Sequence, residues 1–530
     1  MEENKVQERT LESVPPLAAT KEAPNSNGNS SHDSNFVPGE KEDENLVEFA
    51  PNDPGDPRNW PAWRKWAIIL SITIANYTVI WNASGYTTAQ MMFEEQWGTS
   101  AEVAVLPVTL YVLGLAFGPM LLAPLSEYFG RTPVYLSTFL ISTLFLLGTA
   151  VVPTVAGFMI LRFIAGFFCS ACIANIGGTI ADLWDHHHTG FPLSIFTITS
   201  ASGSSSGYFA YSFIAQLQGL KAVLWGMTGV TGGFFVLLCV VMNFSETRHS
   251  VILRRRAAKA RKETGNQELE VAEDMRTQNF KHLVNISLAR PFHFMFTEPV
   301  IIFAAAYNGY LFGLTFLFNG AFALVFGPEG YGFSTIEVGL ANLGVVVGVC
   351  FGPLTHLWQE RYYLRRIEET GGKNIPEARV QTSMVAAVVF PVSLFWFAWA
   401  TYTSVHWIVP IIASAFYGWS FYTLILMTFM YVEDTYKVYA ASALAGVCFA
   451  RNVFGGVFPL FGTQMFENLG YRWAGSLLGF LALLLMPIPF ILERWGRALR
   501  KRSPWAREHM DDLEDDEREA MGVTARTASG

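Results

Sequence analysis

Residues 110–135 read LYVLGLAFGPMLLAPLSEYFGRTPVY and contain two apolar segments separated by a short charged turn. The first segment is uncharged until Glu127, Gly130 and Arg131 follow it, and the second segment begins directly afterwards. Pro133 suits the first turn of a following helix, because proline has a fixed φ and lacks an N–H group that would be unpaired there anyway. The pattern therefore predicts two membrane-length helices joined by a tight hairpin at the bilayer surface.

The composition predicts a membrane protein. Of the 530 residues, 51% are hydrophobic and 15% are charged, whereas about a quarter of the residues are charged in soluble domains. A helix needs ~20 apolar residues to cross about 30 Å of hydrocarbon. Twelve segments meet this requirement: 67–86, 103–125, 134–152, 156–181, 189–215, 222–244, 299–322, 338–358, 383–402, 407–431, 438–462 and 473–492. We expect an all-α integral membrane protein with 12 transmembrane helices.

The placement of basic residues predicts the orientation. Of the 36 lysine and arginine residues, only Lys221 and Arg472 fall on loops that would face outward if the N-terminus is cytosolic. Two more, Arg162 and Arg451, fall inside expected helices, and all the others lie on the inner side. Because cytosolic loops are enriched in lysine and arginine, we expect both termini to be cytosolic.

The same pattern divides the chain into five parts. We expect a disordered cytosolic N-terminal tail (1–57), an N-terminal six-helix bundle (58–245), a cytosolic central loop (246–296), a C-terminal six-helix bundle (297–492) and a cytosolic C-terminal tail (493–530).

The two expected bundles match each other in sequence. GLAFGP at residues 114–119 recurs as GVCFGP at residues 348–353, and WGTS at 97–100 corresponds to YGFS at 331–334 with the same offset. Glu95 and Glu329 also share this offset. These coincidences indicate a duplicated six-helix unit whose two copies point the same way, an arrangement found in transporters with parallel halves.

The charges expected inside the membrane are positive. Arg162 and Arg451 lie within expected helices, whereas no Asp or Glu lies in the middle of one. A buried charge in a membrane helix usually faces the protein interior or a wet cavity, so a central chamber would attract an anion. Packing between helices is the alternative for the polar and aromatic residues that we expect to line the chamber beside the arginines: Asn76, Asn82, Asn175, Asn308, Asn319, Trp419 and Tyr422.

Four motifs resemble the major facilitator superfamily and, within it, the fungal twelve-span drug:proton antiporter family. The hairpin PLSEYFGRTP (124–133) is similar to the signature loop between helices 2 and 3 of the superfamily. LRFIAGFF around Arg162, GGTIADLW around Asp182 and ARNVFGG around Arg451 resemble helix motifs of the family. The resemblance covers about residues 57–495.

The resemblance implies the major facilitator fold, with two pseudo-symmetric six-helix bundles that rock about a central binding site. It also implies that Glu127, Gly130, Arg131 and Asp182 form a conformational latch at the cytosolic face. A solvated loop ion pair, worth about 0–1 kcal/mol, is the alternative. Exporters of the family normally carry proline where this chain has Ser204, so the direction of transport stays open.

We expect a secondary transporter that exports a small organic molecule (an organic anion, secondary metabolite or drug) by alternating access with proton coupling. Uptake of an organic solute is one alternative, and a non-transporting membrane sensor is another. We expect no enzymatic activity, cofactor, metal site or nucleic-acid partner, because the run of histidines at 186–188 is the nearest approach to a metal or catalytic cluster. We also expect the protein to be a monomer in the plasma membrane.

Overall fold

The computed structural model describes residues 47–510 apart from 51, 185–188, 243–244, 267–268, 270, 272–279, 329, 403 and 509. The expected tail residues 1–46 and 511–530 and the histidines at 186–188 therefore lie outside the described residues. The described backbone is helical, with connecting turns and no strand. Its helices are α1 (Ala62–Thr87), α2 (Gln90–Trp97), α3 (Ala101–Phe129), α4 (Arg131–Val151), α5 (Val155–Cys169), α6 (Ala171–Leu183), α7 (Gly190–Met242), α8 (His249–Thr264), α9 (Phe280–Thr297), α10 (Pro299–Phe326), α11 (Thr335–Glu369), α12 (Gln381–Trp399), α13 (Ile408–Tyr436), α14 (Ala440–Leu485), α15 (Pro487–Arg502) and α16 (Pro504–Arg507), with short 3-10 turns η1 (Pro57–Asn59), η4 (Pro376–Val380) and η5 (Lys437–Tyr439).

Ten helical stretches of the described chain are long and apolar enough to cross a membrane. Two of them are double. α7 is interrupted at Gly219, where φ is 80°, and α14 at Gly470, where φ is 72°. Left-handed φ is accessible to glycine at little cost, so each glycine reverses the chain between two crossings. Counting both parts of each interrupted stretch recovers the twelve segments expected from the sequence.

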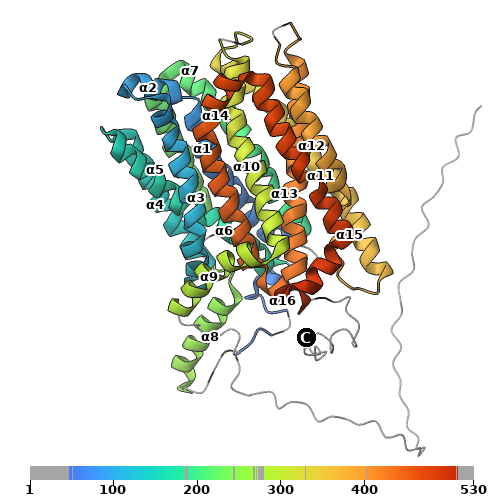
Figure 1. Cartoon of the computed structure of the whole chain (residues 1–530). Coiled ribbons are helices and arrows are strands. Elements are labelled where there is room, and N and C mark those ends of the chain that lie inside the picture. Colours follow the sequence, from blue (N-terminus) through green and yellow to red (C-terminus); the bar gives the residue numbers. More distant parts are fainter. Residues whose placement is uncertain are drawn as a thin grey trace, which may run out of the picture. The chain divides into compact units, whose positions relative to one another are not determined.

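The helices run side by side in two groups (Figure 1). The blue-to-green helices α1, α3, α4, α5, α6 and α7 lie toward one side, and the yellow-to-red helices α10 to α15 lie toward the other. We call these groups the first half and the second half. Contacts of α7 with α11 and of α3 with α14 join them.

Positions that match between the two halves in sequence also have similar backbone conformations. Gly98 and Gly332 both have left-handed φ, of 60° and 77°. Ser100 and Ser334 follow them as the N-cap residues of α3 and α11, and Ser334 forms a complete capping box with Glu337. Equivalent turns therefore introduce equivalent helices, which supports the duplication.

Glycines bring the paired helices of each half into backbone contact. A Cβ on Gly166 of α5 would lie 2.1 Å from the carbonyl oxygen of Tyr111 on α3. In the second half, a Cβ on Gly348 of α11 would lie 1.8 Å from the carbonyl oxygen of Ala415 on α13. Small residues permit this approach in membrane bundles, where close packing replaces the hydrophobic drive. In GLAFGP itself, a Cβ on Gly114 of α3 would lie 2.3 Å from the carbonyl oxygen of Phe163 on α5, so GLAFGP and GVCFGP contain matching packing glycines.

Described residues also flank the two expected bundles. Before the first bundle, Val47 and Phe49 pack on an apolar cluster around Leu253 of α8. At the other end, α15 continues past residue 492 to Arg502, where the bidentate ion pair of Arg500 with Glu377 holds it against η4.

We expect Gly166→Ala and Gly348→Ala to lower the melting temperature of the purified protein, because the added carbon meets backbone that cannot rotate away. Overpacking of this kind costs roughly 1–3 kcal/mol. Thermal unfolding followed by size-exclusion chromatography measures the change.

Gly233→Ala on α7 is the matched control, since a Cβ there meets no atom within 4 Å. Equal melting temperatures for all three variants would show that the glycine contacts do not hold the helices of each half together.

Candidate substrate pathway and charged clusters

Two clusters of buried charge lie at the end of the bundle where α3 passes into α4, and we call this the charged end; the opposite end is the far end. The first is the Asp182 cluster: Asp182, Arg131, Glu246, Arg248 and His249. Asp182 accepts hydrogen bonds from Arg131 Nε at 3.3 Å and Arg248 Nη1 at 3.2 Å, and His249 Nδ1 lies 3.9 Å away. The side chains of Arg131 and Asp182 are each 5% exposed, so this pair lacks the solvent screening that makes surface pairs weak.

Glu246 completes this cluster from the segment that follows α7. Its Oε1 accepts the backbone N–H groups of Arg131, Thr247 and Arg248 at 2.8, 3.0 and 2.9 Å. Gly130 lies against this carboxylate with φ of 110°, and a Cβ there would be 2.1 Å from Glu246 Oε2. Both the backbone conformation and the lack of space therefore require glycine at this position.

Asn175 and Glu127 also lie near this end, but their surroundings differ. Arg131 Nη1 donates to Ser126 Oγ at 2.6 Å, and this hydroxyl donates to Asn175 Oδ1 at 2.9 Å. Asn175, which we expected to line the chamber, thus belongs to the network around Arg131. Glu127 is half-buried on the same turn of α3 and forms no hydrogen bond or ion pair with the residues that the structure describes.

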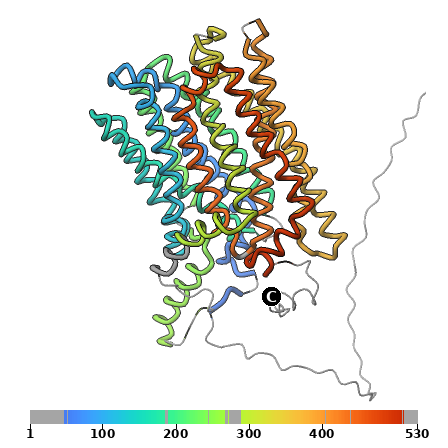
Figure 2. The backbone as a smooth tube through the Cα atoms, in the orientation of Figure 1, coloured from blue at the N-terminus to red at the C-terminus, as the bar shows by residue number. Residues whose placement is uncertain are grey.

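Residues 47–50 and 52–60, which we call the N-terminal strap, run beside α8 and reach the Asp182 cluster (Figure 2). Asp56 Oδ1 lies 3.0 Å from His249 Nε2, and Asp53 forms an ion pair with Arg256. Hydrogen bonding to Arg256 lowers the pKa of Asp53 below its ordinary value. A lowered pKa means that the Asp53–Arg256 pair contributes above the ordinary pKa of aspartate and is lost as the pH falls through the lowered value.

The second half carries a corresponding Arg379 cluster: Arg379, Glu360, Asp434 and Tyr363. Arg379 donates from Nη1 to Glu360 Oε2 at 2.5 Å and from Nε to Asp434 Oδ2 at 2.9 Å. The guanidinium lies over the Tyr363 ring at 3.3 Å, and the Tyr363 hydroxyl donates to the same oxygen of Asp434 at 2.9 Å. These contacts tie α11, η4 and α13 together at the charged end.

The Arg379 cluster was not predicted from the sequence, although one sequence pattern shared by the two halves indicates it. In each half, an arginine lies at or just before the start of the third membrane helix (Arg131 and Arg379). An aspartate lies near the end of the fourth membrane helix (Asp182 and Asp434). The offset of the repeat does not align either pair, because the connection before Arg379 is longer than the single residue Gly130.

The serine-rich part of α7 packs mainly against α1. A Cβ on Gly203 would lie 2.9 Å from Ile80 of α1, which allows the two helices to approach closely. Three side-chain hydrogen bonds join them: Asn76 with Thr199 at 2.8 Å, Tyr77 with Ser202 at 2.6 Å and Trp81 with Ser206 at 2.9 Å. Ser204 differs, because it accepts a hydrogen bond from Asn319 Nδ2 of the second half at 2.9 Å.

Hydrogen bonds link the two halves at several levels. Near the charged end, Tyr422 Oη donates to the carbonyl of Ser194 at 3.1 Å. Midway, Asn452 Nδ2 donates to the carbonyl of Leu115 at 3.1 Å, and near the far end Gln464 Nε2 donates to Glu102 at 3.1 Å. Because Tyr422 and Gln464 bond across the halves near opposite ends, the halves meet at both ends in an occluded arrangement. Four cavities in the described part have volumes of 10 to 40 Å³.

Arg162 is fully buried and has partners within the first half. Its Nη2 donates to the carbonyl of Asn82 at 2.7 Å and its Nε to the carbonyl of Pro107 at 3.4 Å. The guanidinium also lies over the rings of Tyr86 and Tyr111, at 5.3 and 4.7 Å. Asn82 itself donates to Thr231 within the same half. These contacts join α1, α3, α5 and α7, so Arg162 here connects helices of the first half.

Arg451 on α14 has a different environment. It is 1% exposed, and its guanidinium lies over the rings of Phe312 on α10 and Phe429 on α13 at 4.6 and 5.6 Å. Its buried Nε has no hydrogen-bond partner, and no ion pair joins Arg451 to any residue in the described part of the chain. The next residue, Asn452, contacts the first half. Arg451 therefore lies beside the interface between the halves.

Buried amide oxygens without protein partners occur on helices of both halves. They include Oδ1 of Asn308, whose Nδ2 is occupied by its own helix at the carbonyl of Ala304. The others in the described part of the chain are Oδ1 of Asn76, Asn82, Asn319, Asn342 and Asn452. Since an unpaired buried acceptor costs about 1–3 kcal/mol, these oxygens are suited to receive hydrogen bonds from a bound molecule.

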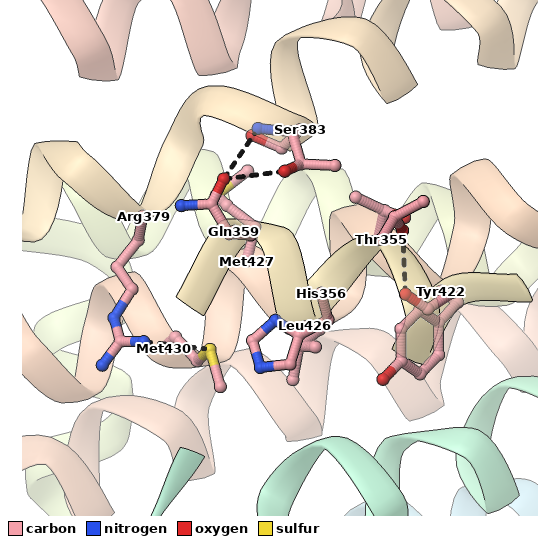
Figure 3. A pocket seen from close by; sticks show the side chains of 12 residues that line it. Thr355, His356, Gln359, Arg379, Ser383, Tyr422, Leu426, Met427 and Met430 are labelled. Atoms are coloured by element: carbon pink, nitrogen blue, oxygen red, sulfur yellow. Dashed lines mark hydrogen bonds between the residues drawn. The ribbon is translucent and has the colours of Figure 1, made fainter. Parts of the chain in front are cut away.

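A cavity of 20 Å³ lies within the second half near the charged end (Figure 3). Thr355, His356 and Gln359 of α11 face Tyr422 and Met430 of α13 across it. Trp419, one of the expected lining residues, donates from Nε1 to Thr355 Oγ1 at 3.1 Å and so bonds within this half. The lining is polar on the α11 side, and the volume accommodates about one water molecule.

We expect Asp182→Asn to loosen the segment after α7, because Arg131 and Arg248 both lose a buried anionic acceptor. Such charged hydrogen bonds are worth about 1.5–3 kcal/mol, so exchange should accelerate roughly tenfold or more. Hydrogen–deuterium exchange of residues 245–257 in the purified chain measures this.

Glu263→Gln is the matched control, since it removes only an exposed pair with Lys259 on α8. Unchanged exchange in the Asp182→Asn protein would contradict the holding role of the Asp182 cluster.

Comparisons with known proteins agree with this architecture. The efflux pump FUBT of Fusarium oxysporum is 34% identical over 472 residues, which cover 88% of this chain and 79% of that protein. The multidrug transporter mdrA of Aspergillus fumigatus is 35% identical over 469 residues, which cover 88% of this chain and 77% of the relative. FLU1 of Candida albicans, also named a multidrug transporter, is 34% identical over 467 residues, covering 87% and 76%.

Among solved structures, a partially occluded inward-open conformation of the xylose transporter XylE from E. coli matches with a TM-score of 0.56. The match covers 80% of this chain and 97% of that chain at 17% identity, and it therefore shows the fold alone. The family model of the Major Facilitator Superfamily matches residues 68–450. With twelve apolar helical crossings and relatives of this kind, the chain is an integral membrane protein that belongs to the Major Facilitator Superfamily.

Proposed function

We propose that the chain exports a small organic molecule, preferentially an anion, by alternating access between its two halves. One observation carries the preference for an anion: the guanidinium of Arg451 is buried beside the interface between the halves without an acceptor among the described residues. Removing one member of a buried ion pair costs about 3–5 kcal/mol because the remaining charge is uncompensated. A carboxylate, sulfonate or phosphate on the substrate would offset that cost.

The two buried arginines have separate roles in this proposal. Arg162 already donates to two carbonyl groups and lies over two tyrosine rings, so it has little need of a further acceptor. Arg451 lies over two phenylalanine rings and donates to no carbonyl or carboxylate in the described part of the chain. The unpaired amide oxygens of Asn308 and Asn319 accept hydrogen bonds and repel acids. A substrate with one acidic group and hydroxyl or N–H groups elsewhere therefore fits both kinds of site.

We further propose that the charged end faces the cytosol and that the protein acts as a monomer in the plasma membrane. The basic segments Arg254–Arg256 and Arg500–Arg502 lie at or beyond this end, as the excess of basic residues on cytosolic loops favours. The Asp182 and Arg379 clusters would then act as latches, one in each half. They hold the helices around the cytosolic opening while it is closed.

The names of the relatives support export. The proteins from Fusarium, Aspergillus and Candida are named as an efflux pump and multidrug transporters. Ser204, which replaces the proline expected in exporters, accepts a hydrogen bond from Asn319 across the halves. Proton movement in the opposite direction would supply the energy for export.

We expect Arg451→Gln to abolish export of organic acids while leaving the protein at normal abundance in the membrane. Yeast cells that lack their own efflux pumps, loaded with a panel of fluorescent carboxylates and cationic dyes, provide the measurement. Loss of a buried ion pair of 3–5 kcal/mol corresponds to a decrease in apparent affinity of roughly a hundredfold or more. Arg451→Lys should retain part of the export.

Arg162→Gln is the informative comparison, because its loss should lower the amount of folded protein rather than change the choice of substrate. Export of cationic dyes alone, or undiminished carboxylate export by Arg451→Gln, would contradict the proposal.

Deletion of the protein from its native cell tests the direction of transport. Export predicts that the internal level of an organic acid rises. Failure of the cell to consume an external compound would instead indicate uptake.

A further inference from the structure

The outer face of α11 changes from apolar to basic at the charged end. Along this face the side chains of Phe351, Leu354 and Trp358 are 57%, 62% and 61% exposed. Residues three and four apart share one face of a helix, so the next positions on it are Arg361 and Arg365, which are both exposed. Large apolar side chains exposed on a membrane-spanning helix contact lipid. The two arginines therefore continue a lipid-contacting surface.

The spacing along the helix places both arginines beside the lipid headgroups. Tryptophan is enriched where a helix leaves the hydrocarbon, which fits the position of Trp358. Arg361 and Arg365 lie about 4.5 and about 10.5 Å further along the axis, and the headgroup layer is about 5–8 Å thick on each side. Side chains tilt toward the N-terminus of their helix. Because α11 ends at the charged end, both arginine side chains lean back toward the headgroups.

Neither arginine has a carboxylate partner among the described residues. The neighbouring Arg366, on a different face, pairs with Glu369 at 3.1 Å, whereas no ion pair joins Arg361 or Arg365 to the described part of the chain. The next charged residue on the outer face, Glu368, lies one turn further from the membrane. Guanidinium groups present a planar fork of donors that matches the oxygens of a phosphate. Two such forks one turn apart suit a phosphate-bearing headgroup.

The inner face of the same turns holds the Arg379 cluster. Glu360 accepts from Arg379 Nη1, and Tyr363 donates to Asp434. One turn earlier, Gln359 Nε2 donates to the carbonyl of Ala378 in η4 at 2.7 Å. A ligand that orders the outer face of these turns therefore also orders the residues that hold η4.

We propose that Arg361 and Arg365 bind the headgroup of an anionic phospholipid, and that the bound lipid stabilises the end of α11 and, through it, the Arg379 cluster. The lipid phosphate accepts hydrogen bonds from both guanidinium groups, and the acyl chains lie along Leu354 and Phe351. With the charged end facing the cytosol, as proposed above, the site meets the leaflet that carries anionic lipids. The inference rests on that orientation in the cell and not on what the protein carries.

The test is native mass spectrometry of the purified full-length protein, delipidated in detergent and titrated with dioleoyl phosphatidylserine or dioleoyl phosphatidylcholine. We expect the double variant Arg361→Gln/Arg365→Gln to bind its first phosphatidylserine roughly thirtyfold more weakly, which is the contribution of two basic residues near an anionic surface. Binding of phosphatidylcholine should not change. Both side chains are exposed, so the double variant should keep the elution volume of the parent protein.

Arg366→Gln is the matched control, because it removes the same charge one residue away and should leave phosphatidylserine binding unchanged. An equal loss in this control, unchanged phosphatidylserine binding in the double variant, or an equal loss of phosphatidylcholine binding would overturn the inference. Displacement of the lipid by inorganic phosphate alone would also overturn it, by showing a site for a soluble anion.

Hydrogen–deuterium exchange of the parent protein tests the second part of the inference without any variant. Phosphatidylserine, but not phosphatidylcholine, should slow exchange of residues 374–382 several-fold, because the end of α11 holds η4 in place. Unchanged exchange at saturating phosphatidylserine would contradict this stabilisation. No transport is measured, so these outcomes leave the anion export through Arg451 to be judged by its own experiment.

Discussion

A guanidinium group inside a membrane-embedded bundle needs acceptors, because the surrounding medium cannot solvate it. Four of the buried arginines in this chain satisfy that requirement within the protein. Arg131, Arg379 and Arg500 have carboxylates, and Arg162 has carbonyl oxygens and tyrosine rings. Arg451 lacks such partners among the described residues, and the proposed binding of an anion rests on this difference.

The positions of the satisfied arginines explain how each half stays rigid. Arg162 joins helices in the middle of the first half, while Arg131 and Arg379 hold helix ends together at the charged end. Glycines such as Gly166 and Gly348 bring helix backbones into contact between these points. Rigid halves that touch through a few hydrogen bonds, such as those of Tyr422 and Asn452, suit a rocking movement better than a continuous core would.

Much of the fold could be predicted from the sequence, because hydrophobic length, the charged hairpin at Gly130 and the repeated glycine motifs are local signals. The partners of individual side chains could not. Glu246 reaches Arg131 across more than a hundred residues of sequence, and the Arg379 cluster combines segments whose spacing departs from the repeat. Asn175 and Trp419 looked like lining residues by type, yet a hydroxyl group within the same half occupies each of them. Spacing alone cannot show which face of a helix meets which neighbour.

The most direct measurement of the central claim is a cryo-electron microscopy map of the purified chain with an exported organic acid bound. The account predicts that the acidic group lies about 3 Å from the guanidinium of Arg451, the distance of a charge-assisted hydrogen bond, with Arg162 still bonded to the carbonyl of Asn82. A map in which the acid binds elsewhere while Arg451 stays between its two phenylalanine rings would contradict it.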